Sequence, residues 1–189
     1  MAVIWLTTAI QSQSITENAF GSPIGEQLLL YPPQLTPLAV VGNMFMHLSI
    51  THLLMNLIML LLLGREIETA TNPWLYGAIF LAGGLGADAA VVHFDAHSAT
   101  AGASGALYAL MVLFVGVAYR RKTDLRAPLV LIAVNLVYTL IIPGISFWGH
   151  LGGLFAGVFL LPTVLSNRLW IRLFSLTLVI PACLYLTFY

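Results

Sequence analysis

Long apolar stretches follow one another along the chain, at about 39–64, 74–92, 102–119, 127–143, 145–165 and 169–189. Several of them approach the ~20 apolar residues that a helix needs to cross a bilayer. The strands of a membrane barrel would instead give short segments of alternating polarity, and that pattern does not occur here. The hydrophobic pattern therefore predicts an all-α, polytopic transmembrane helical bundle.

The first 38 residues differ from the rest of the chain. Residues 2–10 are apolar but too short to span a membrane, and no positive residue precedes them, so a signal peptide fits poorly. We interpret residues 1–11 as the remnant of a truncated first span and the turn-rich residues 12–38 as a long outer loop. Spans two to six then fill residues 39–166, and 169–189 form an extra C-terminal span, all within a single membrane domain, 1–189.

The composition agrees with a lipid environment. Hydrophobic residues make up 60% of the chain and charged residues only 7%, whereas a soluble domain carries roughly 25% charged residues. The net charge is zero and no basic run suggests nucleic acid as a partner. The single cysteine, Cys183, excludes an intrachain disulfide, and we interpret it as a packing residue.

Basic residues predict the orientation. All seven follow spans two, four and six: Arg65, Arg120, Arg121, Lys122, Arg126, Arg168 and Arg172. The positive-inside rule makes that side cytoplasmic. The long loop 12–38, the loop that contains His93 to Ser98 and the turn 143–146 are then expected to face outward.

Polar residues inside a bilayer are costly and are candidates for function. Span four opens with Ser104, and span six carries His150. At ~1.5 Å per helical residue, Ser104 lies roughly 24 Å above Arg120, and His150 is at a similar height above Ser166. The two side chains are therefore expected at matching depth, towards the outer face.

Span two carries His47, His52 and Asn56. His52 and Asn56 are four residues apart and share a helix face, whereas His47 is expected well round the helix. Counted from Gly64, His52 lies near ~18 Å and Asn56 near ~12 Å, so Asn56 fits the depth of the other residues least well. Both rise by about a turn if the helix continues towards Glu68.

These residue types suit nucleophilic catalysis. A serine becomes a nucleophile when a histidine accepts its proton, and an oxyanion beside Ser104 would meet its backbone N–H, His52 and Asn56. No acidic residue lies at matching depth, so we predict a dyad, with the ring of Tyr108 stacking on His150. Glycines spaced four apart, Gly149, Gly153 and Gly157, would let the spans of Ser104 and His150 approach. Taken alone, each of these features is also typical of plain helix packing, and the residues leave both readings open.

Three separate motifs resemble those of the rhomboid family. Gly102-Ala103-Ser104-Gly105, with Tyr108, looks like the rhomboid nucleophile motif; the run from Gly149 to Gly157 resembles its sixth-span motif; and His47, His52 and Asn56 match its H-x4-H-x3-N motif. Glu68 also falls where the family keeps an acidic residue. The match covers about residues 12–166.

The resemblance implies a fold and a set of roles. The fold would be a six-helix core with an extra C-terminal span. Ser104 would be the nucleophile and His150 the general base; His52, Asn56 and the Ser104 backbone N–H would form the oxyanion hole. Gly102, Gly105, Tyr108, His47 and Gly153 would support the site, His47 by bracing the first loop. The activity implied is serine endopeptidase cleavage of transmembrane proteins, without a metal or cofactor.

We accordingly expect an integral, multi-pass protein of the bacterial inner membrane, with transmembrane proteins and the lipid bilayer as partners and an active site open to the extracytoplasmic side. One alternative is a non-catalytic rhomboid-like protein that binds or escorts membrane clients. A transporter using the histidines is disfavoured because the inner halves of these spans are apolar. A metal site of His93, Asp95 and His97 would lack a fourth ligand, so we interpret that segment as a solvated loop.

Overall fold

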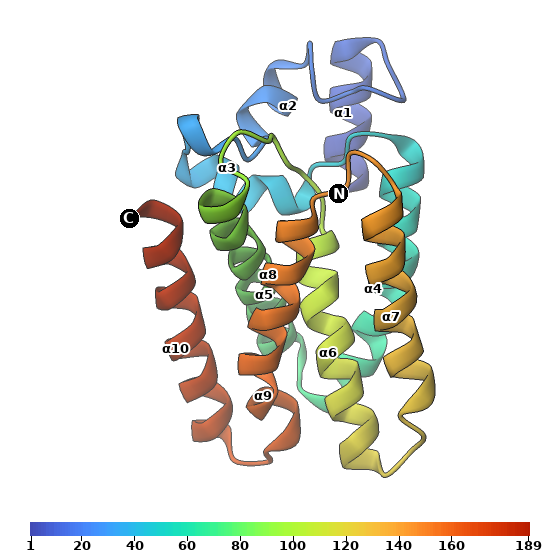
Figure 1. Ribbon diagram of the computed structural model, residues 1–189, viewed down its shortest axis with the longest axis vertical. Helices are drawn as coiled ribbons and strands as arrows, with labels where there is room; N and C mark the ends of the chain where they lie inside the picture. The colour runs from blue at the N-terminus through green and yellow to red at the C-terminus, as the bar shows by residue number, and fades with distance from the viewer.

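The computed structural model describes residues 1–189 and is built from helices, with one isolated β-bridge. The long helices run side by side in Figure 1 and are α4 (Ile50–Ala70), α5 (Pro73–Phe94), α6 (Ser104–Arg121), α7 (Arg126–Ile141), α8 (Phe147–Leu160), which α9 (Pro162–Leu165) continues, and α10 (Leu169–Phe188). The prediction of an all-α bundle is confirmed.

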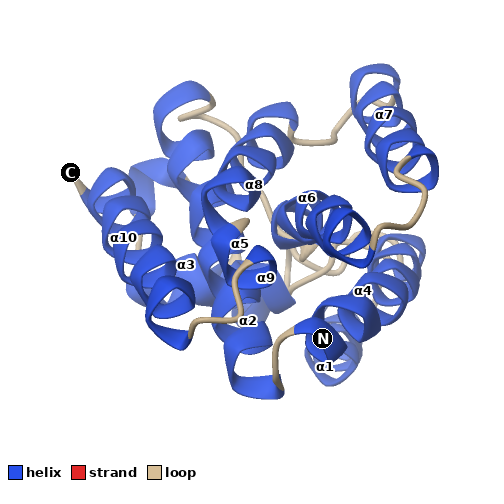
Figure 2. Ribbon diagram, turned by 90° about the horizontal axis from the view of Figure 1, so that it is seen from below, coloured by secondary structure: helices blue, strands red, loops and turns tan.

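Four segments are long and apolar enough to cross a membrane: α4, α5, α8 together with α9, and α10. Helix α7 is apolar but shorter. Helix α6 contacts α4, α5, α7 and α8, and Figure 2 shows it surrounded by its neighbours. Large apolar side chains such as Leu61, Leu140 and Trp170 are 74%, 70% and 64% exposed on the outside of the bundle. Such a surface is compatible with lipid but not with water.

The predicted span 39–64 is not one helix, and this expectation was wrong. The segment contains α3 (Pro37–Gly42), the 3₁₀ turn η2 (Asn43–Phe45) and an extended stretch before α4. Helix α4 begins only at Ile50 because the Ser49 hydroxyl accepts the His52 N–H and caps it. At the other end it continues past Gly64 to Ala70, the extension considered above.

The predicted outer loop 12–38 contains short helices of its own. These are α2 (Pro23–Leu28) and the turn η1 (Pro32–Gln34), and they gather at one end of the bundle in Figure 1 with α1 (Ala2–Ser12), which precedes the loop, and α3, which follows it. The bridge between Leu30 and Thr100 joins this segment to the loop before α6 by two N–H···O bonds of 3.0 and 2.9 Å.

The opposite end of the bundle carries the basic residues. The Arg120 guanidinium donates to the carbonyl oxygens of Val164 and Ala70, so it ties the last turns of α9 and α4 together. Arg121 forms an ion pair with Glu66. The turns 122–125 and 166–168 lie at this end in Figure 1, so the basic end and the long loop lie at opposite ends of the bundle, as the sequence predicts.

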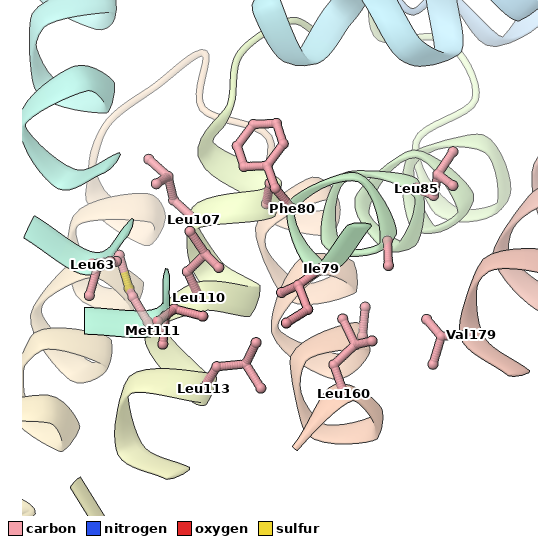
Figure 3. Packing of buried hydrophobic residues seen from close by; sticks show 14 of the residues in the cluster. Leu63, Ile79, Phe80, Leu85, Leu107, Leu110, Met111, Leu113, Leu160 and Val179 are labelled. Carbon is pink, nitrogen blue, oxygen red and sulfur yellow. The ribbon is translucent and has the colours of Figure 1, made fainter. Parts of the chain in front are cut away.

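Buried apolar side chains fill the centre, as Figure 3 shows for Leu63, Ile79, Leu110 and Leu160. Above this core, α6 and α8 meet through glycine. A Cβ added to Gly153 would lie 2.0 Å from the Gly105 carbonyl oxygen, so only glycine permits this approach. The close contact brings the first turns of α6 and α8 together.

Candidate active site

Ser104 and His150 meet at the N-terminal ends of these two helices. Ser104 is the first residue of α6, and His150 lies in the first turn of α8. The distance from Ser104 Oγ to His150 Nε2 is 2.8 Å, a hydrogen bond. The imidazole is 7% exposed, whereas Ser104 is partly exposed. The structure thus brings together the two residues that the sequence placed at matching depth.

The ring of Tyr108 lies flat against the imidazole. The two ring centroids are 4.3 Å apart with an interplanar angle of 20°. Tyr108 follows Ser104 by one helical turn, which puts its ring below the hydroxyl and over His150. This is the stacking expected from the sequence.

The second nitrogen of His150 has a partner that the sequence reasoning missed. His150 Nδ1 lies 2.7 Å from the hydroxyl oxygen of Thr139, on α7. The Tyr108 hydroxyl is also 2.7 Å from that oxygen. No Asp or Glu bonds His150. The signal in the sequence was a lone threonine in the apolar run of residues 136–142, and nothing in the spacing marks it as a neighbour of His150.

His52 and Asn56 lie on α4, beside the loop that leads into Ser104. The His52 ring packs against Gly102 so closely that a Cβ there would be 2.7 Å from its Cε1 atom. The Asn56 amide donates to the His52 carbonyl oxygen at 2.8 Å, and its buried Oδ1 has no partner. Because α4 extends to Ala70, Asn56 stands roughly 21 Å above the helix end. The misfit in its depth therefore disappears.

His47 does not lie on the helix at all, and its predicted position was wrong. It belongs to the extended stretch before α4, is fully buried, and meets the His52 ring edge-on with centroids 5.1 Å apart. Its Nδ1 is 3.4 Å from the Phe45 carbonyl oxygen. The break in the helix is what allows both histidines to face the same side.

The loop before Ser104 is held by a buried polar network. The Gly102 N–H donates to the Asn43 carbonyl oxygen at 2.8 Å, and the Asn43 amide donates to Asp88 Oδ2 at 3.1 Å. Asn43 and Asp88 are 4% and 3% exposed, so neither bond competes with bulk water. Asp88 thus bonds a neighbouring residue and stays outside the Ser104–His150 pair.

The arrangement has the parts of a serine nucleophile and its base. As the first residue of α6, Ser104 has a backbone N–H without an acceptor inside the helix, at the positive end of the helix dipole. The residues His93, Asp95 and His97 do not form a metal-binding group. Asp95 Oδ1 instead accepts a hydrogen bond from the Ser98 hydroxyl at 2.6 Å.

Curated relatives match most of this bundle. RHOMBOID-like protein 4 of Arabidopsis thaliana is 34% identical over 131 residues, which cover 66% of the chain and 33% of that protein. RHOMBOID-like protein 6, mitochondrial, of the same plant is 33% identical over 160 residues, covering 77% and 52%. Rhomboid protease GluP of Bacillus subtilis is 32% identical over 120 residues, covering 60% and 23%.

The chain therefore spans about half or less of the length of these relatives. Their origins also correct the expected location. Because plant and mitochondrial proteins stand beside a bacterial one, the comparisons do not support a bacterial inner membrane in particular. They support an integral membrane protein.

The family model described as the Rhomboid domain matches residues 35–167, from the end of the long outer loop to the turn before α10. That range contains Ser104, His150, His52 and Asn56, and it covers more than half of the chain. The chain belongs to the rhomboid family.

Proposed function

We propose that this protein is an intramembrane serine endopeptidase that cleaves transmembrane proteins, with Ser104 as nucleophile and His150 as general base. The observation that carries the proposal is the 2.8 Å hydrogen bond between Ser104 Oγ and His150 Nε2. Serine reacts at neutral pH when such a base accepts its proton. Membership of a family that includes a named rhomboid protease supports the same reaction.

The proposed mechanism has two halves. In the first, Ser104 Oγ attacks the scissile carbonyl carbon while His150 Nε2 takes the hydroxyl proton, and His150 then protonates the departing amine. In the second, water attacks the acyl-enzyme, His150 accepts a proton from that water, and the proton returns to Ser104 as the acid leaves. Every proton passes through Nε2, so the imidazole must keep one orientation throughout.

The oxyanion of each tetrahedral intermediate would be bound next to Gly102. The Ser104 backbone N–H, the His52 ring and the Asn56 amide are the proposed donors. The His52 ring makes no hydrogen bond within the protein and lies against the loop at Gly102, which leaves it available to a substrate oxygen. Asn56 uses one amide hydrogen on the His52 carbonyl and keeps a second. Loss of one such donor typically costs about 2.7–4 kcal/mol of transition-state stabilisation.

The site lies at the end of the bundle that carries the long outer loop. We therefore propose that it opens to the extracytoplasmic side and that substrates reach it from the bilayer. The chemistry of the dyad requires neither metal nor cofactor. A chain that only escorted membrane clients would need neither the Ser104–His150 bond nor the stacked Tyr108.

The test is cleavage of a transmembrane reporter by the purified protein in detergent or in reconstituted vesicles. We expect cleavage by the wild type, none by Ser104→Ala or His150→Ala, and wild-type activity for Ser166→Ala, a serine at the opposite end of the bundle. A fluorophosphonate probe should label the wild type and Ser166→Ala but not Ser104→Ala. Cleavage or labelling that persists in Ser104→Ala would overturn the mechanism. A folded wild type that neither cleaves nor labels would favour the escort function.

A further inference from the structure

A dyad without an acid still needs something to orient its imidazole, because Nε2 has to face Ser104 and carry no hydrogen before the attack. We propose that Thr139 is the positioning residue of the dyad. Its hydroxyl accepts a hydrogen bond from His150 Nδ1 and so selects the tautomer in which Nε2 is free to take the Ser104 proton. The catalytic consequence rests on the proposed function, whereas the tautomer itself does not.

The direction of each hydrogen bond follows from counting hydrogens. The Thr139 oxygen lies 2.9 Å from the Asn135 carbonyl oxygen and 2.7 Å from both the Tyr108 hydroxyl and His150 Nδ1. A carbonyl oxygen can only accept, so the single hydroxyl hydrogen of Thr139 points to Asn135. The two lone pairs of Thr139 then accept from Tyr108 and from Nδ1–H.

This assignment places one hydrogen in every short contact, including the bond from Ser104 to Nε2. The opposite tautomer would direct the Thr139 hydrogen to Nδ1 and leave its contact with the Asn135 carbonyl without a hydrogen. It would also make Nε2 a donor to Ser104, which cannot activate a nucleophile. The network therefore favours the reactive tautomer.

Burial makes the selection effective. Thr139, Tyr108 and His150 are 4%, 3% and 7% exposed. Because water does not reach these groups, a hydrogen-bond donor left without an acceptor raises the free energy of the site. The two interactions on His150 are also complementary: Tyr108 restrains the ring from its face, and Thr139 fixes the rotation of the ring within that plane.

The position of Thr139 links the dyad to α7. Only Pro128 and Thr139 are buried along this helix, and they lie near its opposite ends. Thr139 is therefore the buried residue through which the C-terminal half of α7 packs against the rest of the bundle. A consequence is that His150 holds its reactive orientation only while that end of α7 is docked against α6 and α8.

The kinetic test compares two replacements of nearly the same size. Thr139→Val keeps the shape but removes the hydroxyl, and Thr139→Ser keeps the hydroxyl. We expect Val to lower kcat by about 100-fold, the scale of a misplaced catalytic group, with KM unchanged, and Ser to retain most of the activity. Thr177→Val, which removes an exposed hydroxyl on α10, serves as the matched control.

A double variant separates positioning from simple loss of a partner for Tyr108. If Thr139→Val acted only by leaving the Tyr108 hydroxyl unpaired, adding Tyr108→Phe would restore the rate. Positioning predicts that the double variant stays slow. Equal rates for Val, Ser and wild type, or recovery in the double variant, would overturn the proposal.

The tautomer is tested without any substrate. In ¹⁵N NMR spectra of histidine-labelled protein, with His150 identified by subtraction of a His150→Ala spectrum, we expect Nδ1 to carry the hydrogen in the wild type and in Thr139→Ser. Thr139→Val should show a mixture or the other tautomer. An Nε2-protonated wild type would overturn the proposal even if the protein cleaves. An inactive protein with the expected Nδ1–H signal would instead overturn only the proposed protease function.

Discussion

Two constraints require glycine at position 102, in the loop that leads into Ser104. Its φ is +129°, in the region that favours glycine. An added Cβ would also lie 2.7 Å from Cε1 and 2.8 Å from Nε2 of His52. We expect Gly102→Ala to displace the His52 ring or the loop and to lower reporter cleavage by about 100-fold, as small displacements in active sites do.

The matched control for that substitution is Gly77→Ala on α5. A Cβ at Gly77 would meet no atom within 4 Å, and its φ is ordinary. This variant should keep wild-type cleavage and gain roughly 0.5–1 kcal/mol of helix stability. If Gly102→Ala cleaved the reporter as fast as Gly77→Ala, then the His52–Gly102 contact would not matter for catalysis.

At this scale, the sequence alone singles out those polar residues that are costly to place in an apolar helix. Ser104, His150, His52 and Asn56 are polar groups in apolar helices, and helical rise alone gave Ser104 and His150 similar heights. Thr139 is different because a threonine in a membrane helix usually bonds its own backbone, as its hydroxyl also does with Asn135. Its contact with His150 depends on the rotation of α7, which no local spacing specifies.

Helices α6 and α8 depend on glycine for the close approach that brings Ser104 to His150. A Cβ at Gly153 would lie 2.0 Å from the oxygen and 2.7 Å from the carbon of the Gly105 carbonyl, and backbone atoms cannot rotate away. We expect Gly153→Ala to push the helices apart, to destabilise the fold by about 1–3 kcal/mol or more, and to separate Ser104 from His150.

Two measurements follow the effect of Gly153→Ala. The midpoint of thermal unfolding in detergent should fall, and fluorophosphonate labelling of Ser104 should slow even at temperatures where the variant stays folded. Gly77→Ala, an identical change on a helix surface with free space, should show neither effect. Unchanged labelling of a folded Gly153→Ala variant would contradict a role for this contact in assembling the dyad.

The element boundaries show what hydrophobicity alone misses. Residues 39–64 are predominantly apolar, so their pattern predicts one span. The Ser49 cap nevertheless starts a new helix at Ile50, and the preceding stretch turns His47 towards His52. The cap is a local signal, but it competes with a strong apolar pattern that fits both a continuous and a broken helix. The polar residues beyond Gly64 likewise left the end of this helix open in the sequence, whereas the structure continues α4 to Ala70, whose carbonyl oxygen accepts a hydrogen bond from Arg120.

On the scale of the whole molecule, the basic residues and the proposed active site occupy opposite ends. Arg120 and Arg121 end α6, and Ser104 begins it, so this one helix separates the basic end from the dyad by roughly 26 Å. The positive-inside rule predicts that the basic end is cytoplasmic. On that prediction the proposed active site lies towards the far side, together with the residues before α4 and the Leu30–Thr100 bridge.

The single native cysteine makes this orientation directly testable. In a Cys183→Ser background, Lys122→Cys would label the turn after α6 and His97→Cys the exposed loop after α5. We expect a membrane-impermeant maleimide added to intact cells to modify His97→Cys and to spare Lys122→Cys until the membrane is opened, because the two sites lie at opposite ends of the bundle. Labelling of Lys122→Cys alone in intact cells would invert the topology. It would place the dyad on the cytoplasmic side, and with it the part of a substrate that could be cut.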